Sequence, residues 1–188
     1  MKKLLLSAAA IMAFSVVSHA QEIKFGVKAG LNIADFGGDA ETEGSRTGFH
    51  AGGLAEFKLT ETFSIQPELL YSMQGAKGKD ILTGEEYDLK FDYINIPIMA
   101  KYYLMEGLSI EAGPQVGFLM SAKAEDEDIK DSYKSIDIAL NGGVAYDLPM
   151  GLFFQARYSA GISDISDIEG SDDKITNNVI SLSVGYKF

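Results

Sequence analysis

The sequence predicts an all-β protein, an eight-stranded antiparallel up-and-down barrel of the transmembrane kind. Three observations lead to this prediction. Apolar and polar residues alternate with period two in eight segments, the connections between these segments alternate between short and long, and the last segment keeps its alternation up to Phe188. No segment shows a sustained helical period.

The last segment, residues 178–188, has the clearest pattern. One side is apolar and ends in Tyr186 and Phe188, and the other is polar or small and ends in Lys187. A tilted strand that crosses a bilayer takes roughly 9–11 residues, so the segment is long enough to do so. We interpret Tyr186 and Phe188 as an outer-membrane assembly signal.

The earlier segments follow the same rule, in chain order. In the first three, Lys28, Glu56 and Glu68, respectively, lie on the polar side of the strand, opposite its apolar side. The fourth changes phase, because its early apolar residues end at Tyr93 and its later ones begin at Ile94. A one-residue phase change inside a strand predicts a β-bulge near Tyr93.

The fifth, sixth and seventh segments return to simple alternation. They carry Glu111, Asp137 and Arg157, respectively, on their polar sides. The eight predicted strands are residues 22–33, 47–59, 62–73, 87–102, 108–120, 135–146, 152–161 and 178–188.

The connections predict the topology. Three are short, and four are long, polar and rich in glycine, serine and acidic residues. Short periplasmic turns and long outer loops are typical of outer-membrane barrels. The short connections are residues 58–61, 103–107 and 147–151, and the long ones are residues 34–46, 74–86, 121–134 and 162–176.

Period two alone does not say which side faces outward. A soluble lipocalin-like barrel also has eight strands, but its apolar side faces inward around a ligand. Glycine at many positions of the polar side, such as Gly30 and Gly185, favours a narrow lumen. Aromatic residues near the strand ends, such as Phe25 and Phe57, are typical of a membrane-interface belt. We therefore expect the apolar side to face lipid.

The first twenty residues predict export. Lys2 and Lys3 precede an apolar run that is too short for a spanning helix, and the run ends in small residues. We expect a signal peptide, residues 1–20, with cleavage between Ala20 and Gln21, and a barrel domain over residues 21–188. Delivery to the outer membrane of a Gram-negative bacterium follows, with membrane lipid and the barrel-assembly machinery as partners.

Composition excludes several classes of function. The net charge is -11 and there is no cysteine, which argues against nucleic-acid partners, disulfides and thiolate chemistry. After cleavage His50 is the one remaining histidine, and no nucleophile, zinc or phosphate-loop motif is present. We expect no enzyme activity and no cofactor.

The polar side also predicts the interior of the barrel. Opposite charges in near-equal number suit a packed lumen, because an unpaired buried charge is costly. An eight-stranded barrel is just wide enough for side chains to fill it. The expected lumen charge network is Lys24, Lys28, Glu56, Glu68, Lys90, Asp92, Lys101, Glu111, Asp137 and Arg157.

The long connections carry most of the acidic residues, notably within residues 125–131 and 164–173. Carboxylate oxygens suit Ca²⁺ or Mg²⁺, but the first segment lacks the glycine and terminal glutamate of an EF-hand loop, and the second fits that pattern no better. We expect solvated acidic loops, with at most weak binding of divalent cations and no metal site.

Two segments of the chain resemble a known family. They are Phe25-Gly26-Val27-Lys28-Ala29-Gly30-Leu31-Asn32 and Tyr93-Ile94-Asn95-Ile96-Pro97. It is the bacterial outer-membrane β-barrel domain family, labelled porin family protein or PorT-like, of small OmpA- or OmpX-type barrels. The resemblance covers residues 21–188. It implies the barrel and its location, and it leaves the ligand open.

Three functions stay open. The first is a structural and surface-interaction role through acidic extracellular loops that meet a surface partner. The second is a low-conductance porin-like channel. The third, implied by the PorT-like resemblance alone, is an accessory barrel that meets components of a protein secretion system. With no domain expected after Phe188, we expect no peptidoglycan-anchoring role.

Overall fold

The computed structural model describes residues 22–40, 42–79, 84, 86–125, 127–167 and 173–188. The predicted cleavage site, Ala20 and Gln21, lies outside the described residues, and cleavage there stays a prediction. None of the described residues belongs to a helix long and apolar enough to cross a membrane.

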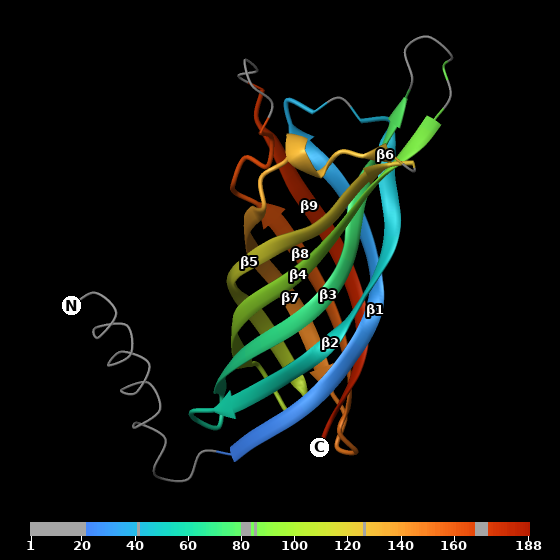
Figure 1. Cartoon of the computed structure of the whole chain (residues 1–188). Helices are drawn as coiled ribbons and strands as arrows, with labels where there is room; N and C mark the ends of the chain where they lie inside the picture. Colours follow the sequence, from blue (N-terminus) through green and yellow to red (C-terminus); the bar gives the residue numbers. More distant parts are fainter. Residues whose placement is uncertain (1–21, 41, 80–83, 85, 126, 168–172) are drawn as a thin grey trace, which may run out of the picture.

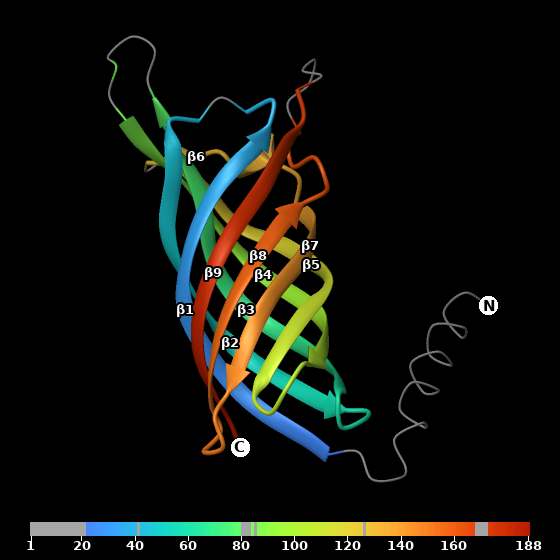
Figure 2. The same cartoon turned by 180° about the vertical axis from the view of Figure 1, so that it is seen from behind.

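Eight long strands form one closed antiparallel ring (Figures 1 and 2). Each pairs with its neighbours in the chain, β4 pairs with β5, and β1 pairs with β9 to close the ring. The predicted eight-stranded antiparallel barrel is confirmed. The strands are β1 (Glu22–Gly38), β2 (Gly44–Lys58), β3 (Phe63–Lys79), β4 (Glu86–Tyr103), β5 (Leu108–Ala124), β7 (Ile136–Asp147), β8 (Leu152–Gly161) and β9 (Ile175–Lys187).

The connections lie at two different ends. Residues 59–62, 104–107 and 148–151 form the short-turn end, where Phe188 also lies (Figure 1). Gly107 and Gly151 adopt positive φ angles of 80° and 91° in two of these turns, which glycine tolerates without steric cost. The opposite, long-loop end carries the two-residue strand β6 (Glu127–Asp128) and the 3₁₀ turn η1 (Lys130–Ser132).

The part of the barrel between the short turns and the level of Tyr93 has an apolar outer side. Leu31, Leu69, Ile98 and Leu182 are each about half exposed on four different strands, as expected of side chains that face lipid. Polar residues predominate on the inner side, together with a few buried apolar ones such as Met99 and Phe153, and glycine makes room for large neighbours. A methyl group at Gly185 would lie 2.3 Å from the buried ring of Phe153.

The part of the barrel next to the long loops reverses this arrangement. Phe36, Phe91, Tyr93 and Leu119 point inward and form an apolar cluster with Ile165 from the last long loop. We call this cluster, with Ala76 and Ala122, the apolar cap. The outer side at this level carries charged residues such as Lys90 and Lys123. An apolar inside and a charged outside are expected of a part of the barrel that stands in water above the lipid.

The reversal corrects two predictions. Lys90 and Asp92 do not point into the lumen; they lie on the outer side of β4, opposite in direction to the buried Phe91 and Tyr93. The inward and outward alternation of β4 runs on without a phase change. What changes along the strand is the surroundings, from water to lipid, so the apolar residues move from the inner to the outer side.

A bulge does lie at this level. Asp92 pairs with Ser121 and Tyr93 pairs with Leu119, so the extra residue is Met120 on β5 rather than a residue of β4. The strands also continue further than predicted into the long-loop end. β1 reaches Gly38, and alternation there continues with Ala34 and Phe36 inside.

The position of the lipid boundary can be tested with single cysteines, because the chain has none of its own. We expect Lys90→Cys to react with a bulky, water-soluble maleimide in folded protein in lipid vesicles. Ile96→Cys, on the same side of β4 but within the apolar belt, should stay unlabelled until the protein is unfolded. Equal labelling of both positions would contradict the boundary.

Candidate functional site

The middle of the lumen is closed by four charged side chains. Lys28 of β1, Glu68 of β3, Glu111 of β5 and Arg157 of β8 are all buried, and we call them the central charge layer. Arg157 donates to both oxygens of Glu68 at 2.8 and 3.0 Å and, through Nε, to Glu111 at 2.8 Å. Lys28 Nζ lies 2.8 Å from Glu68 Oε2.

Two amides complete the central charge layer. Gln155 accepts from Lys28 Nζ at 2.7 Å and donates to Glu111 Oε2 at 2.9 Å. Gln66 donates to Glu68 Oε1 at 2.7 Å. Two cations therefore face two anions, and amides occupy the remaining hydrogen-bonding positions, as a buried ion cluster requires.

A neutral polar layer lies above the central charge layer. His50 contacts Asn32 Oδ1 through Nδ1 and Ser183 Oγ through Nε2, both at 2.8 Å, which suits a structural histidine better than a base. The cavity between this layer and Arg157 has a volume of about 20 Å³, enough for about one water molecule.

A second ion cluster fills the lumen near the short-turn end. Lys187 Nζ lies 2.6 Å from Glu56 Oε2 and 2.7 Å from Asp147 Oδ1. Lys101 Nζ lies 3.4 Å from Asp147 Oδ2 and 3.8 Å from Glu56 Oε2. The hydroxyl of Tyr103 hydrogen-bonds Glu56 and lies 3.1 Å from Asp147 Oδ2. We call these five residues the mouth charge layer.

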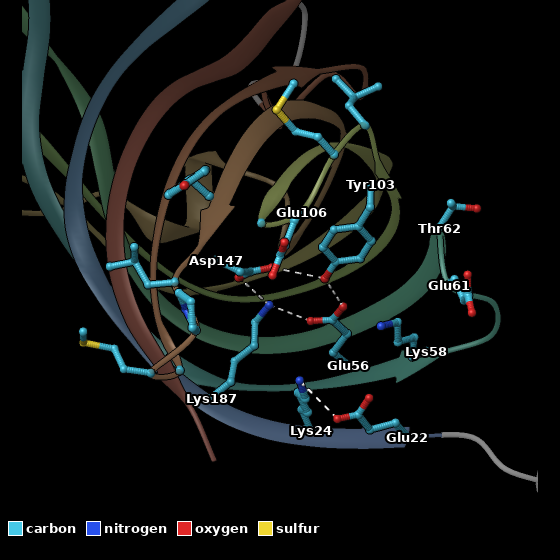
Figure 3. A pocket seen from close by; sticks show the side chains of 18 of the residues that line it. Glu22, Lys24, Glu56, Lys58, Glu61, Thr62, Tyr103, Glu106, Asp147 and Lys187 are labelled. Atoms are coloured by element: carbon cyan, nitrogen blue, oxygen red, sulfur yellow. Dashed lines mark hydrogen bonds and ion pairs between the residues drawn. The ribbon is translucent and has the colours of Figure 1, made fainter.

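Below the mouth charge layer the barrel opens into a cavity of about 930 Å³, the mouth cavity. In Figure 3, Glu56, Tyr103, Asp147 and Lys187 point toward one another at its inner end, and Lys58 and Glu61 lie on its wall. The mouth cavity opens at the short-turn end. At the other end of the lumen the apolar cap follows, with Ile165 fully buried.

Most of the predicted network residues come together, in two separate groups rather than one. The central charge layer holds four of them, and the mouth charge layer holds Glu56 and Lys101. Asp137 points inward near the long-loop end, where it accepts from Ser163 Oγ at 2.9 Å and from Asn177 Nδ2 at 3.2 Å.

Lys24 does not join either group. Its side chain is 48% exposed at the rim of the mouth cavity and pairs with Glu22 at 3.2 Å. Sequence reasoning missed Lys187, Asp147 and Tyr103 as network members. Lys187 was visible on the polar side of the last strand, but Asp147 and Tyr103 sit where strands meet turns, and alternation says little there.

The remaining predicted positions have simple surroundings. Tyr186 and Phe188 lie on the outer side at the short-turn end, exposed by 47% and 72%, and their role as an assembly signal stays a prediction. Within the described ranges, no group of three acidic, histidine or cysteine side chains is arranged to hold a metal ion. The two acidic loop segments each include residues beyond those ranges.

A closed eight-stranded ring with a lipid-facing belt and ion clusters inside defines an integral outer-membrane β-barrel protein. Residues 19–167 match the family described as outer membrane protein beta-barrel domain, and the chain belongs to this family. The family expected from the resemblance is confirmed. In such barrels the short-turn end faces the periplasm and the long-loop end is extracellular.

Solved structures of small outer-membrane barrels are similar in fold. Neisserial surface protein A is 16% identical over 90% of this chain and 100% of its own, with a TM-score of 0.61. Ail, the attachment invasion locus protein of Yersinia pestis, is 14% identical over 89% and 99%, with a TM-score of 0.55.

OprG from Pseudomonas aeruginosa is 14% identical over 88% of this chain and 95% of its own, with a TM-score of 0.52. Identities this low show the common fold and nothing about ligands. A comparison with curated protein sequences finds no significant relative.

The central charge layer makes a testable prediction about stability. Glu68→Gln leaves Lys28 and Arg157 without their shared anion in a dry interior, so we expect the free energy of unfolding to fall by about 3–5 kcal/mol. Urea unfolding in lipid vesicles measures it. Lys24→Gln, at the exposed rim, should leave the unfolding midpoint unchanged; a similar midpoint for both variants would contradict the prediction.

Proposed function

We propose that this protein is a non-conducting outer-membrane module that presents a preformed, acidic interaction surface on its extracellular side. One observation carries the proposal: the third and fourth long loops are joined to each other by backbone hydrogen bonds. Lys134 N donates to Ile165 O at 2.9 Å, and Asp167 N donates to Ser132 O at 3.0 Å. We call residues 129–134 and 162–167 the loop platform.

Side chains hold the loop platform in the same arrangement. Asp164 accepts from Lys134 Nζ at 2.6 Å and from the backbone N–H groups of Ser166 and Ile175, both at 3.0 Å. Ile165, between them, is buried in the apolar cap. A loop pinned at this many points has lost most of its conformational freedom before a partner arrives, which favours specific binding.

Charge indicates the kind of partner. On and beside the loop platform, carboxylates are more numerous than cations, and most are exposed. They include Glu127, Asp128, Asp131, Asp167 and Asp173, against Lys130, Lys134 and Lys174. A basic surface suits it best. Ail has been crystallised with the heparin analogue sucrose octasulfate, which is anionic, and the acidic loops here favour the opposite charge.

A low-conductance channel is the second candidate, because most residues that line the lumen from the mouth cavity up to His50 are polar. The central charge layer and the apolar cap both argue against it. Planar-bilayer recordings of folded protein test this directly: we expect a silent bilayer, and reproducible discrete current steps would contradict the non-conducting proposal. A role in secretion rests on the resemblance alone and stays a prediction.

The loop interaction has its own test. Cells that display the protein should adhere to surfaces coated with a basic polypeptide more than to surfaces coated with an acidic one. Replacing Glu127, Asp128 and Asp131 by their amides should remove most of this difference, and added salt should weaken it. The matched control neutralises Glu61 and Glu106 at the periplasmic end; equal loss in the control would contradict a role for the loops.

The loop platform should also depend on pH in a defined window. The ammonium group of Lys134 and the backbone donors lower the pKa of Asp164 from 3.8 to about 2. A lowered pKa stabilises the folded loop above pH 4, and this stabilisation is lost as pH falls through about 2. Limited proteolysis should find residues 162–167 protected at pH 4 and cleaved near pH 2. Asp164→Asn should be cleaved at both, with the barrel intact.

A further inference from the structure

We propose that the mouth cavity binds an extended, basic segment of another polypeptide from the periplasmic side. The inner end of the cavity supplies the first argument. Each charged group of the mouth charge layer already has a partner of opposite sign within the layer. That layer therefore closes the cavity, and the unsatisfied charges lie nearer its opening.

Three charged residues of the wall have no ion pair with any described residue: Lys58, Glu61 and Glu106. The lining as a whole carries more carboxylates than ammonium groups. They are Glu22, Glu56, Glu61, Glu106 and Asp147, against Lys24, Lys58 and Lys187. Lys101 lies just behind the lining, 3.4 Å from Asp147 Oδ2, which leaves one carboxylate in excess. The electrostatic field of such a recess attracts cations and disfavours anions.

Apolar side chains line the same opening. Leu104, Met105, Met150 and Phe188 are 53%, 64%, 69% and 72% exposed and border the mouth cavity. A small inorganic cation would leave this surface in water. Methionine is flexible and polarizable, so it adapts to apolar side chains of varied shape. The lining thus fits a ligand that carries both basic and apolar groups.

The backbone of β1 favours an extended segment. The pairing of β1 with β9 ends near the mouth cavity: Gly26 pairs with Lys187, and Phe188 N donates to Phe25 O at 2.9 Å. Because alternate residues of a strand point to the same edge, the N–H and C=O groups of Ile23 face this edge too. They have no backbone partner among the described residues, and an added strand could pair there.

Lysine-rich peptide binding to folded protein in nanodiscs of zwitterionic lipid tests the proposal. The protein used carries Glu127→Gln, Asp128→Asn and Asp131→Asn, so that the acidic extracellular surface does not bind the probe as well. The probe is a fluorescein-labelled octapeptide of alternating lysine and serine with one central leucine; its counterpart has glutamate in place of lysine. We expect saturable, salt-sensitive binding of the basic peptide alone. Glu61→Gln with Glu106→Gln should raise Kd about fivefold, as two exposed ion pairs would.

Matched variants separate the site from general charge effects. Glu43→Gln with Glu125→Gln removes two exposed carboxylates from the long-loop end, outside the loop platform, and should leave Kd unchanged. Ile23→Pro removes one N–H donor at the open edge while the pairing of β1 with β2 at Lys24 is kept. It should weaken peptide binding without shifting the thermal unfolding midpoint.

Three results would overturn the proposal. They are no saturable binding, equal binding of the acidic peptide, and equal Kd with and without the Glu61 and Glu106 substitutions. Empty nanodiscs are the control for binding to lipid, and their signal is subtracted. The extracellular adhesion assay uses other residues, so either proposal can fail alone.

Discussion

The ion pairs of Glu68 are the interaction on which the rest of the interior depends. Both oxygens of its carboxylate accept a hydrogen bond from Arg157, and one of them also pairs with Lys28. These residues come from β3, β8 and β1, which means that the cluster spans the lumen instead of joining neighbours in the sheet. A one-residue slip of any of these strands would turn its charge toward lipid. The cluster therefore stabilises one strand register over its alternatives.

Above and below that cluster the same tube is filled by different means. The mouth charge layer uses a second set of mutually paired ions, and the apolar cap uses aromatic rings, with Phe91 in edge contact with Phe36 at 5.1 Å between ring centroids. Because the lumen is filled in this way, the surfaces open to a partner are at the two ends of the barrel. The extracellular end is covered by joined loops, and the periplasmic end is hollow. The two proposed interactions accordingly lie at opposite ends of the barrel.

Sequence alternation predicted the ring well because lipid and lumen impose one simple rule over most of each strand. It failed for Lys90 and Asp92, because the rule reverses where the strand leaves the lipid, and alternation alone carries no mark of that level. It also could not foresee that Lys187 meets Glu56 and Asp147. Which residues face each other across a closed ring depends on how far each strand is shifted along its neighbour. This shift produces no periodic pattern in the sequence.

The water-facing upper part of the barrel has a consequence for how the protein reaches its place. Its charged outer side, including Lys90 and Asp92, ends up beyond the lipid, so these residues must traverse the hydrocarbon layer during insertion. A lysine exposed at the bilayer midplane costs about 2–4 kcal/mol, and several strands carry such groups. Stepwise passage of finished strands through lipid would add these costs together. The architecture thus favours a route in which the upper strand ends cross in a sheltered, hydrated path and the ring closes afterwards.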